Sequence, residues 1–248
     1  MRRFGLIGYP LEHSFSKIYF TEKFESENIE NCQYMNYPIE SVDKLIALIS
    51  ENKDLVGLNV TIPYKEKVIQ YLDAIDNTAK EIGAVNTVKI DRLQSGYKLV
   101  GYNTDAYGFH SSLVPHVKKV HKKALILGTG GASKAIAYVL NQLGIQYIYV
   151  SRNPRMENHI SYKDLDSDFM DNCKIIINTT PLGMYPEVNK SPDIPYESIT
   201  TDHLLYDLVY NPEMSKFLEK GAKRGAFIKN GLLMLHLQAE KAWEIWNS

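Results

Sequence analysis

The chain has 248 residues, and its 28 Lys and Arg residues nearly balance its 29 Asp and Glu residues. A net charge of −1 provides no basic field for a nucleic-acid backbone, and no run of about 18 apolar residues is present to span a membrane, so both classes of protein are disfavoured. Cys32 and Cys173 belong to no metal-type cluster, and the apolar run at the N-terminus is too short for a secretory signal. We therefore expect a cytoplasmic protein with no disulfide framework and no bound metal, folded as one large domain or two smaller ones.

The first half of the chain alternates strand-like and helix-like segments. Apolar runs predict the strands, and apolar residues at helical spacing predict the helices between them. The predicted strands are residues 4–8, 33–39 and 55–62, and the predicted helices are residues 14–28, 42–49 and 68–72. This alternation favours a largely parallel sheet, to which residues 84–90 and 97–102 add a β-hairpin.

The second half begins with a strand–turn–helix–strand unit. An apolar strand at 122–127 runs into the glycine-rich turn 128–132, and a helix ending at residue 143 leads to a strand at 146–150. Further predicted features are strands at 174–178 and 204–208, an exposed loop at 182–195 and a final helix after Gly231. The apolar stripe of that final helix consists of Leu232, Leu235, Ala239, Ala242 and Trp246.

The glycine-rich turn is typical of a dinucleotide site. Glycines let the backbone approach a pyrophosphate, and the following helix N-terminus offers free N–H groups. The sixth position of the usual Gly-x-Gly-x-x-Gly pattern is Ser133, so the motif is a variant, and a simple tight turn is the alternative.

The next strand ends without the acidic residue that an NAD site usually places on the ribose. It ends instead in Ser151, Arg152 and Asn153, with Arg155 just beyond. A guanidinium binds phosphate with two parallel hydrogen bonds, so we predict NADP rather than NAD. The alternative is a solvated basic loop.

Polar side chains in the first half gather at predicted turns and strand ends, where binding sites tend to form. They are Ser14, Ser16, Asn59, Thr61, Lys65, Asn86 and Asp105. Each has a local alternative as a helix cap, a solvated strand face, a charged helix start or a turn residue. His13 is interpreted as a packed or solvated side chain rather than a metal ligand, because no second metal-type residue accompanies it.

Eight segments along the chain have distinctive sequences. They are Gly-Tyr-Pro and His-Ser-Phe-Ser within 8–16, Asn-Val-Thr-Ile-Pro-Tyr-Lys at 59–65, Gly-Ala-Val-Asn-Thr at 83–87, Asn-Thr-Asp at 103–105, Gly-Thr-Gly-Gly-Ala at 128–132, Asn-Thr-Thr-Pro-Leu-Gly-Met at 178–184, Asp-Leu-Val-Tyr-Asn-Pro at 207–212, and Asn-Gly, Met-Leu and Gln-Ala within 230–239. Together and in this order, they resemble the shikimate dehydrogenase family almost from end to end.

The resemblance implies an α/β enzyme with a mostly parallel N-terminal α/β sheet domain, a Rossmann-like NADP-binding domain and a cleft between them. Residues 1–105 would form the substrate-binding catalytic domain, with the C-terminal helix 232–248 packed back on it, and residues 106–231 the dinucleotide-binding domain. The implied reaction is the reversible NADPH-dependent reduction of 3-dehydroshikimate to shikimate, in aromatic amino-acid (chorismate) biosynthesis. The implied protein is a monomer or homodimer whose partners are small molecules.

The resemblance also assigns roles to residues. Lys65 would be the general acid/base and Asp105 its partner. Ser14 and Ser16 would bind the carboxylate of the substrate. Its ring hydroxyls would be bound by Thr61, Asn86, Asp105 and Gln238. Asn59 would be a supporting amide, and Tyr210 would line the site near the nicotinamide. The cofactor would be bound by Gly128, Thr129, Gly130, Gly131, Ala132, Ser151, Arg152, Asn153, Thr180, Leu208 and Gly231.

The chain departs from the family pattern just after the two serines. Lys17 stands where the family usually has Pro, and Tyr19 and Phe20 stand where it usually has His-Asn. Two other functions remain open from the sequence: an NAD-using quinate/shikimate dehydrogenase, and a catalytically silent nucleotide- or metabolite-binding protein on the same fold.

Overall fold

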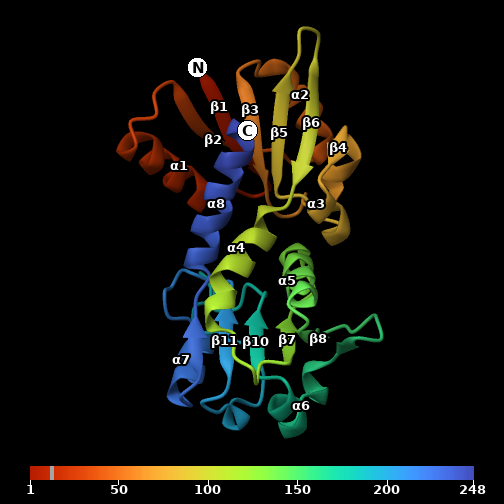
Figure 1. The fold of residues 1–248 in the computed structure, drawn as a ribbon, viewed down its shortest axis with the longest axis vertical. Coiled ribbons are helices and arrows are strands. Elements are labelled where there is room, and N and C mark those ends of the chain that lie inside the picture. Colours follow the sequence, from red (N-terminus) through yellow and green to blue (C-terminus); the bar gives the residue numbers. More distant parts are fainter. Residues whose placement is uncertain (12–13) are drawn as a thin grey trace. The chain divides into compact units, whose positions relative to one another are not determined.

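The computed structural model describes residues 1–11 and 14–248, so His13 and the neighbouring Glu12 lie outside the described residues. The chain forms two compact units (Figure 1). Unit 1 comprises Met1–Tyr107 and Gln238–Ser248, and unit 2 comprises Gly108–Leu237. The boundaries fall inside two helices, α4 (Thr104–Leu113) and α8 (Leu232–Asn247).

Unit 1 is built on a mixed six-stranded sheet. Its strands are β1 (Arg2–Gly8), β2 (Cys32–Pro38), β3 (Leu55–Val60), β4 (Ala74–Ile75), β5 (Thr87–Arg92) and β6 (Tyr97–Tyr102). Their order in the sheet is β2-β1-β3-β5-β6-β4. β1 pairs in parallel with β2 and β3, and the short β4 pairs in parallel with β6. The two antiparallel pairs, β3–β5 and β5–β6, lie between these parallel pairs.

Apolar residues cover both faces of this sheet. On one face, α1 (Phe15–Ser26) and the C-terminal part of α8 share an aromatic cluster that includes Phe4, Phe20, Tyr34 and Trp246. The other face is covered by the short helices η1 (Val42–Lys44), α2 (Leu45–Glu51), η2 (Lys67–Tyr71) and α3 (Asn77–Ile82). Burial on both faces explains the near-continuous apolar runs of the central strands.

The helix predicted at 68–72 is only a short 3₁₀ turn, η2, and α3 was not predicted. Asp73 ends the turn because its backbone N–H donates to the Leu99 carbonyl while its carboxylate accepts from the Leu99 N–H at 2.7 Å. The chain is thereby drawn onto β6 before a full α-helical turn can propagate.

Unit 2 contains a fully parallel six-stranded sheet. Its strands are β7 (Lys123–Leu127), β8 (Gln146–Val150), β9 (His159–Ile160), β10 (Ile175–Asn178), β11 (Leu204–Asp207) and β12 (Phe227–Lys229), in the order β12-β11-β10-β7-β8-β9. The helical segments are η3 (Val114–His116), α5 (Gly131–Gln142), η4 (Tyr162–Asp164), α6 (Ser167–Asn172), η5 (Tyr196–Ser198) and α7 (Lys216–Lys223). The strand–turn–helix–strand unit predicted at 122–150 is therefore present as β7–α5–β8, and the sheet has the doubly wound parallel form of dinucleotide-binding folds.

The apolar stripe of α8 differs at its start from the prediction. Leu232 is 37% exposed, because it occupies the first turn of the helix. The buried row instead follows a spacing of four residues through Met234, Gln238, Ala242 and Trp246. This row places an amide, Gln238, among apolar neighbours, and a buried amide needs a polar partner.

Candidate functional site

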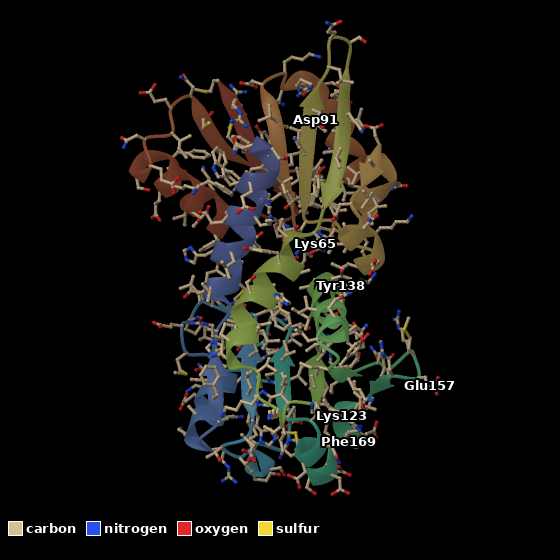
Figure 2. The ribbon with its side chains drawn as sticks, viewed as in Figure 1. Lys65, Asp91, Lys123, Tyr138, Glu157 and Phe169 are labelled. Carbon is tan, nitrogen blue, oxygen red and sulfur yellow. The ribbon has the colours of Figure 1, made fainter. Side chains whose placement is uncertain are left out.

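Lys65 and Asp105, 40 residues apart in sequence, meet at one end of the unit 1 sheet. The Nζ atom of Lys65 lies 2.6 Å from Oδ2 of Asp105, and the two side chains are 16% and 11% exposed. Figure 2 shows Lys65 at the end of the sheet opposite Asp91, which lies on β5 near the hairpin turn. Two other polar residues singled out in the sequence join Lys65 and Asp105, because Asn86 is hydrogen-bonded to Asp105 and Asn59 to Asn86.

The local fold leaves the Asp105 carboxylate available for this pairing. The N-cap of α4 is supplied by Asn103, whose Oδ1 accepts from the Ala106 N–H at 3.2 Å and whose Nδ2 donates to the Ala84 carbonyl. Asp105 therefore lies in the first turn of α4 without acting as its cap. A carboxylate there is also favoured by the positive end of the helix dipole.

Asn86 connects Asp105 to the strand ends. Its Nδ2 donates to Asp105 Oδ1 at 2.9 Å, and its Oδ1 accepts from the Thr104 N–H at 2.7 Å. Asn86 is 3% exposed and immediately precedes β5. One carboxylate is thus held by an ammonium on one oxygen and an amide on the other.

The Asn59 side chain uses both ends of its amide inside the protein. Its Oδ1 accepts from the Tyr34 hydroxyl at 2.7 Å, and its Nδ2 lies 3.3 Å from Thr87 Oγ1 and 3.4 Å from the Asn86 carbonyl. This geometry fits a supporting amide better than one presented to a ligand. The Tyr34 and Thr87 side chains, which the sequence did not single out, are buried with it.

Ser14, Ser16, Thr61 and Gln238 complete the predicted substrate set in unit 1. Ser14 is the N-cap of α1, with its hydroxyl accepting from the Lys17 N–H at 3.2 Å, and Ser16 and Thr61 are half-buried. Gln238 is 6% exposed, and its Oε1 accepts from the Thr104 hydroxyl at 3.4 Å. Gln238 therefore meets the same polar network as Asn86.

The residues at the departure from the family pattern have defined contacts. The Tyr19 hydroxyl donates to Glu240 on α8, and the buried Lys23 ammonium lies 2.9 Å from the same carboxylate. Burial, followed by the hydrogen bond to Glu240, raises the pKa of Tyr19 above its ordinary value. The Phe20 ring stacks on Tyr34 with centroids 4.8 Å apart. Both side chains thus fix α1, whose first turn carries the serines, to its neighbours in unit 1.

The predicted cofactor residues of unit 2 lie along one edge of its sheet. Leu127, Val150, Asn178 and Asp207 are the last residues of β7, β8, β10 and β11, and the parallel register sets them side by side. The predicted residues follow directly: Gly128, Ser151, Thr180 and Leu208 come one or two positions later. The carboxyl edge of such a sheet is where α/β proteins bind ligands, and Lys123 in Figure 2 marks the opposite edge.

The glycine-rich turn fits a pyrophosphate. Gly128 has φ +105°, a region that other residues rarely adopt, and its N–H donates to the Val150 carbonyl. Gly130 is the N-cap of α5 without a side-chain cap, and a Cβ built there meets only open space within 4 Å. The turn formed with Thr129, Gly131 and Ala132 thus leaves the first N–H groups of a 12-residue helix facing an uncrowded backbone cradle.

The variant sixth position of the motif has a local explanation. Ser133 is 1% exposed, and its hydroxyl donates to the Gly130 carbonyl at 2.6 Å. A serine here therefore tightens the turn from inside, where the third glycine of the usual motif would only permit close packing.

The loop after β8 exposes Arg152 and Asn153 to solvent, and the Asn153 N–H donates to Ser151 Oγ at 3.2 Å. The turn thus presents an arginine and a serine at consecutive positions of the chain. The donor set suits a phosphate group, which accepts hydrogen bonds on three oxygens.

Asn178 and Asp207 form a buried polar pair beneath this edge, and the sequence alone did not indicate that they meet. Asn178 Nδ2 donates to Asp207 Oδ1 at 2.9 Å, while its Oδ1 accepts from the N–H and hydroxyl of Thr180. Asp207 also accepts from the Ser215 hydroxyl at 2.5 Å. Burial raises the pKa of Asp207 to about 6. Each of these two apolar strands ends in a polar residue, and this signal could have revealed the pair.

Two remaining predicted residues of unit 2 lie close to the same edge. Gly231 packs so tightly that a Cβ there would lie 2.3 Å from the Leu208 carbonyl oxygen, which explains why only glycine fits. Tyr210 is half-buried, and burial raises the pKa of its phenol.

The described residues contain no group of three or more His, Cys, Asp and Glu side chains that could hold a metal ion. Within residues 1–11 and 14–248, no helix is long and apolar enough to cross a membrane.

Comparison with known proteins places this geometry in a family. A model of the shikimate dehydrogenase substrate-binding domain matches residues 6–88. A curated NADP⁺-dependent shikimate dehydrogenase of Methanococcus vannielii is 39% identical, and the match covers 98% of this chain and 90% of the relative. The crystal structure of shikimate dehydrogenase 1 from Peptoclostridium difficile is 40% identical with a TM-score of 0.84, covering 100% of this chain and 92% of that one. The shikimate 5-dehydrogenase of Thermus thermophilus, solved in complex with NADP(H) and shikimate, is 29% identical with a TM-score of 0.84, covering 99% and 93%.

Proposed function

The chain belongs to the shikimate dehydrogenase family, and on this premise we propose that it catalyses the reversible NADP-dependent reduction of 3-dehydroshikimate to shikimate. The observation that carries the proposal is the Lys65–Asp105 pair, with 2.6 Å between Nζ and Oδ2, held in a buried polar network at the end of the unit 1 sheet. An ammonium held beside a carboxylate can donate and accept a proton, which is the chemistry that carbonyl reduction requires of the protein.

Lys65 is the group that handles the proton. In the direction of reduction, its ammonium donates a proton to the ketone oxygen as that oxygen gains negative charge, and it stabilises the developing alkoxide. In the direction of oxidation, the neutral amine takes the proton of the substrate hydroxyl. NADPH, when bound, supplies the hydride that reduces the carbonyl carbon.

Asp105 orients the lysine and shares in substrate binding. Its Oδ2 faces Lys65 and its Oδ1 faces Asn86, so the carboxylate is fixed in one orientation. We assign Thr61, Asn86, Asp105 and Gln238 to the ring hydroxyls, with Asn59 supporting Asn86 and Thr87 from behind. A site built to hydrogen-bond several hydroxyls rejects analogues that lack one, because its buried polar groups would stay unpaired.

Ser14 and Ser16 at the start of α1 are assigned to the substrate carboxylate. Hydroxyls in the first turn of a helix, close to its free N–H groups, suit an anion. Tyr210 is assigned to the substrate side of unit 2 next to the nicotinamide.

The cofactor residues assigned in unit 2 divide by chemistry. The backbone of residues 128–132 takes the pyrophosphate, and Ser151, Arg152 and Asn153 take the adenosine 2′-phosphate. Thr180, Leu208 and Gly231 lie along the carboxyl edge of the sheet and are assigned to the nicotinamide half.

The test is nicotinamide absorbance on addition of shikimate to the purified protein, with NADP and NAD in parallel and quinate as a second substrate. Rapid turnover with NADP and shikimate supports the proposal. Turnover mainly with NAD and quinate would keep the Lys65 chemistry but overturn the cofactor and substrate assignments. Absence of turnover in every combination would favour a silent binding protein.

We also propose that the protein acts in the cytoplasm on small molecules, with no nucleic-acid partner, in the aromatic amino-acid pathway. The balance of charge supports the absence of a nucleic-acid partner. Light scattering would distinguish a monomer from a homodimer.

A further inference from the structure

Beyond the residues that would touch substrate, a line of buried hydrogen bonds runs across the end of the unit 1 sheet. We propose that Tyr34, Asn59 and Thr87 form a positioning chain, an inference that rests on the proposed function. This chain fixes Asn86 and Asp105, and through them Lys65, in the reactive arrangement. Tyr34 lies on β2 and Thr87 on β5, so the chain crosses from the outer strand β2 to the hairpin.

Backbone groups fix the orientation of both amides in this chain. The Nδ2 of Asn59 lies 3.4 Å from the Asn86 carbonyl, which only accepts, so Asn59 Oδ1 must face Tyr34 and the Tyr34 hydroxyl must donate to it at 2.7 Å. The Oδ1 of Asn86 lies 2.7 Å from the Thr104 N–H, which only donates, so Asn86 Nδ2 must face the Asp105 carboxylate.

The Thr87 hydroxyl joins the two amides. Its oxygen accepts from Asn59 Nδ2 at 3.3 Å, and it donates to Asn86 Oδ1 at 3.1 Å. Every hydrogen bond from Tyr34 to Asp105 therefore points in the same direction, with the donor on the Tyr34 side. Dipoles aligned head to tail strengthen one another, and all are aimed at the one carboxylate that holds Lys65.

Burial makes this alignment persistent. The exposed fractions are 3% for Tyr34, 4% for Asn59, 0% for Thr87 and 3% for Asn86, so water does not compete for these groups. If one link is removed, its partner is left buried without a hydrogen bond or must turn to find another. Either response changes the orientation of Asn86 and of the carboxylate beyond it.

The head of the chain is coupled to α1. The Phe20 ring, one helical turn after Ser16, stacks on Tyr34 at 4.8 Å with an angle of 12° between the rings. Burial raises the pKa of the Tyr34 phenol, and a hydrogen bond with Ser16 acts in the opposite direction. The stacking of Phe20 on Tyr34 thus sets the head of the chain against the helix that carries the two serines assigned to the substrate carboxylate.

The experiment compares single substitutions that remove one hydroxyl each. Tyr34→Phe removes the head of the chain, and Thr87→Val removes its middle while keeping the shape of the side chain. Thr87→Ser keeps the hydroxyl as a rescue. Tyr37→Phe is the matched control, because Tyr37 is also on β2 but is half-buried and directs its hydroxyl to Met35 Sδ at 3.8 Å, away from the chain.

For each folded variant, kcat, the KM for shikimate and NADP, and the kinetic isotope effect with shikimate deuterated at the oxidised carbon are measured. We expect Tyr34→Phe and Thr87→Val to lower kcat about tenfold, the effect of one well-placed hydrogen bond, with a larger isotope effect and an unchanged KM for NADP. Thr87→Ser and Tyr37→Phe should stay within about twofold of the original protein.

The inference is overturned if Tyr34→Phe and Thr87→Val lower the melting temperature but keep kcat and the isotope effect, because the chain would then be merely structural. It is also overturned if Tyr37→Phe lowers kcat as much as Tyr34→Phe. An inactive original protein is a different result, since it would overturn the proposed function and the inference that rests on it together.

Discussion

The two units of this protein hold their candidate sites by opposite means. In unit 1, the site consists of side chains that fix one another, with Lys65, Asp105 and Asn86 joined by hydrogen bonds between side-chain atoms. In unit 2, the site consists mainly of backbone, with Gly128 and Gly130 shaping an open turn at the start of α5. The first arrangement depends on the identity of each residue, whereas the second depends on the absence of side chains.

The largest effect is expected for Lys65→Ala, which removes one of the side chains that fix one another in unit 1. Loss of general acid/base help typically costs about 100-fold or more, so we expect kcat to fall at least that far while substrate binding changes little. Steady-state kinetics with shikimate and NADP measure both. Lys67→Ala, an exposed lysine two residues later at the start of η2, is the control and should leave kcat unchanged. Near-normal turnover in Lys65→Ala would remove Lys65 from its assigned role.

Unit 1 also shows how far sequence reasoning reaches. Strand and helix periodicity predicted most elements, and the residue types of Lys65, Asp105 and Asn86 suggested chemistry. Their meeting could not be predicted from spacing, because it requires that β3 ends where β5 and α4 begin, at one end of the sheet. From the sequence, only the resemblance to a family assigned these residues to one site.

The residues that sequence reasoning missed are those that look apolar or neutral in their own strand. Tyr34 and Thr87 are ordinary β-strand formers, and nothing in their local pattern distinguishes a hydroxyl aimed at Asn59 from one facing solvent. The antiparallel pairing of β3 with β5 sets Asn59 opposite Thr87. That pairing depends on the tertiary structure and cannot be predicted from the sequence of either strand alone.

Unit 2 offers a second test, in which a side chain tunes a site made of backbone. Arg152→Ala should weaken NADP far more than NAD, because only NADP carries the 2′-phosphate. Loss of a charged hydrogen-bonded contact is worth about 1.5–3 kcal/mol, or roughly ten- to a hundredfold in the ratio of the two Kd values. The two cofactors serve as each other's control in one titration series. Equal losses for both would contradict the assignment of Arg152 to the phosphate.

A pair of glycine substitutions separates the two uses of glycine in unit 2. Gly231→Ala places a Cβ 2.3 Å from the Leu208 carbonyl oxygen, so we expect a loss of stability of about 1–3 kcal/mol and weaker NADP binding. Gly130→Ala has open space around its Cβ and an ordinary negative φ, so stability should be kept while NADP binding weakens. Thermal melts and NADP titrations of both variants measure the difference. Equal stability in the two variants would show that the close approach at Gly231 relaxes easily.

The smallest predicted effect concerns Asp207, the buried carboxyl beneath the carboxyl edge of unit 2. Burial raises its pKa to about 6 even though Ser215, Val209 and Asn178 all donate to it. A group whose pKa is higher in the folded state than in the unfolded chain contributes stability that is present at low pH and is lost as the pH rises through about 6. Asp207→Asn keeps an acceptor for Asn178 and Val209 but removes the titration.

The unfolding free energy of Asp207→Asn should therefore rise relative to that of the original protein by about 1 kcal/mol between about pH 5 and pH 7. Urea denaturation followed by circular dichroism at several pH values measures this difference, in which the titration of all other groups cancels. Two parallel curves would show that Asp207 is ionised through the whole range, with its three donors outweighing burial. The Asn178–Asp207 pair would then depend on an ionised side chain, as the Lys65–Asp105 pair does. The contrast between side chains in unit 1 and backbone in unit 2 would hold only for the glycine-rich turn.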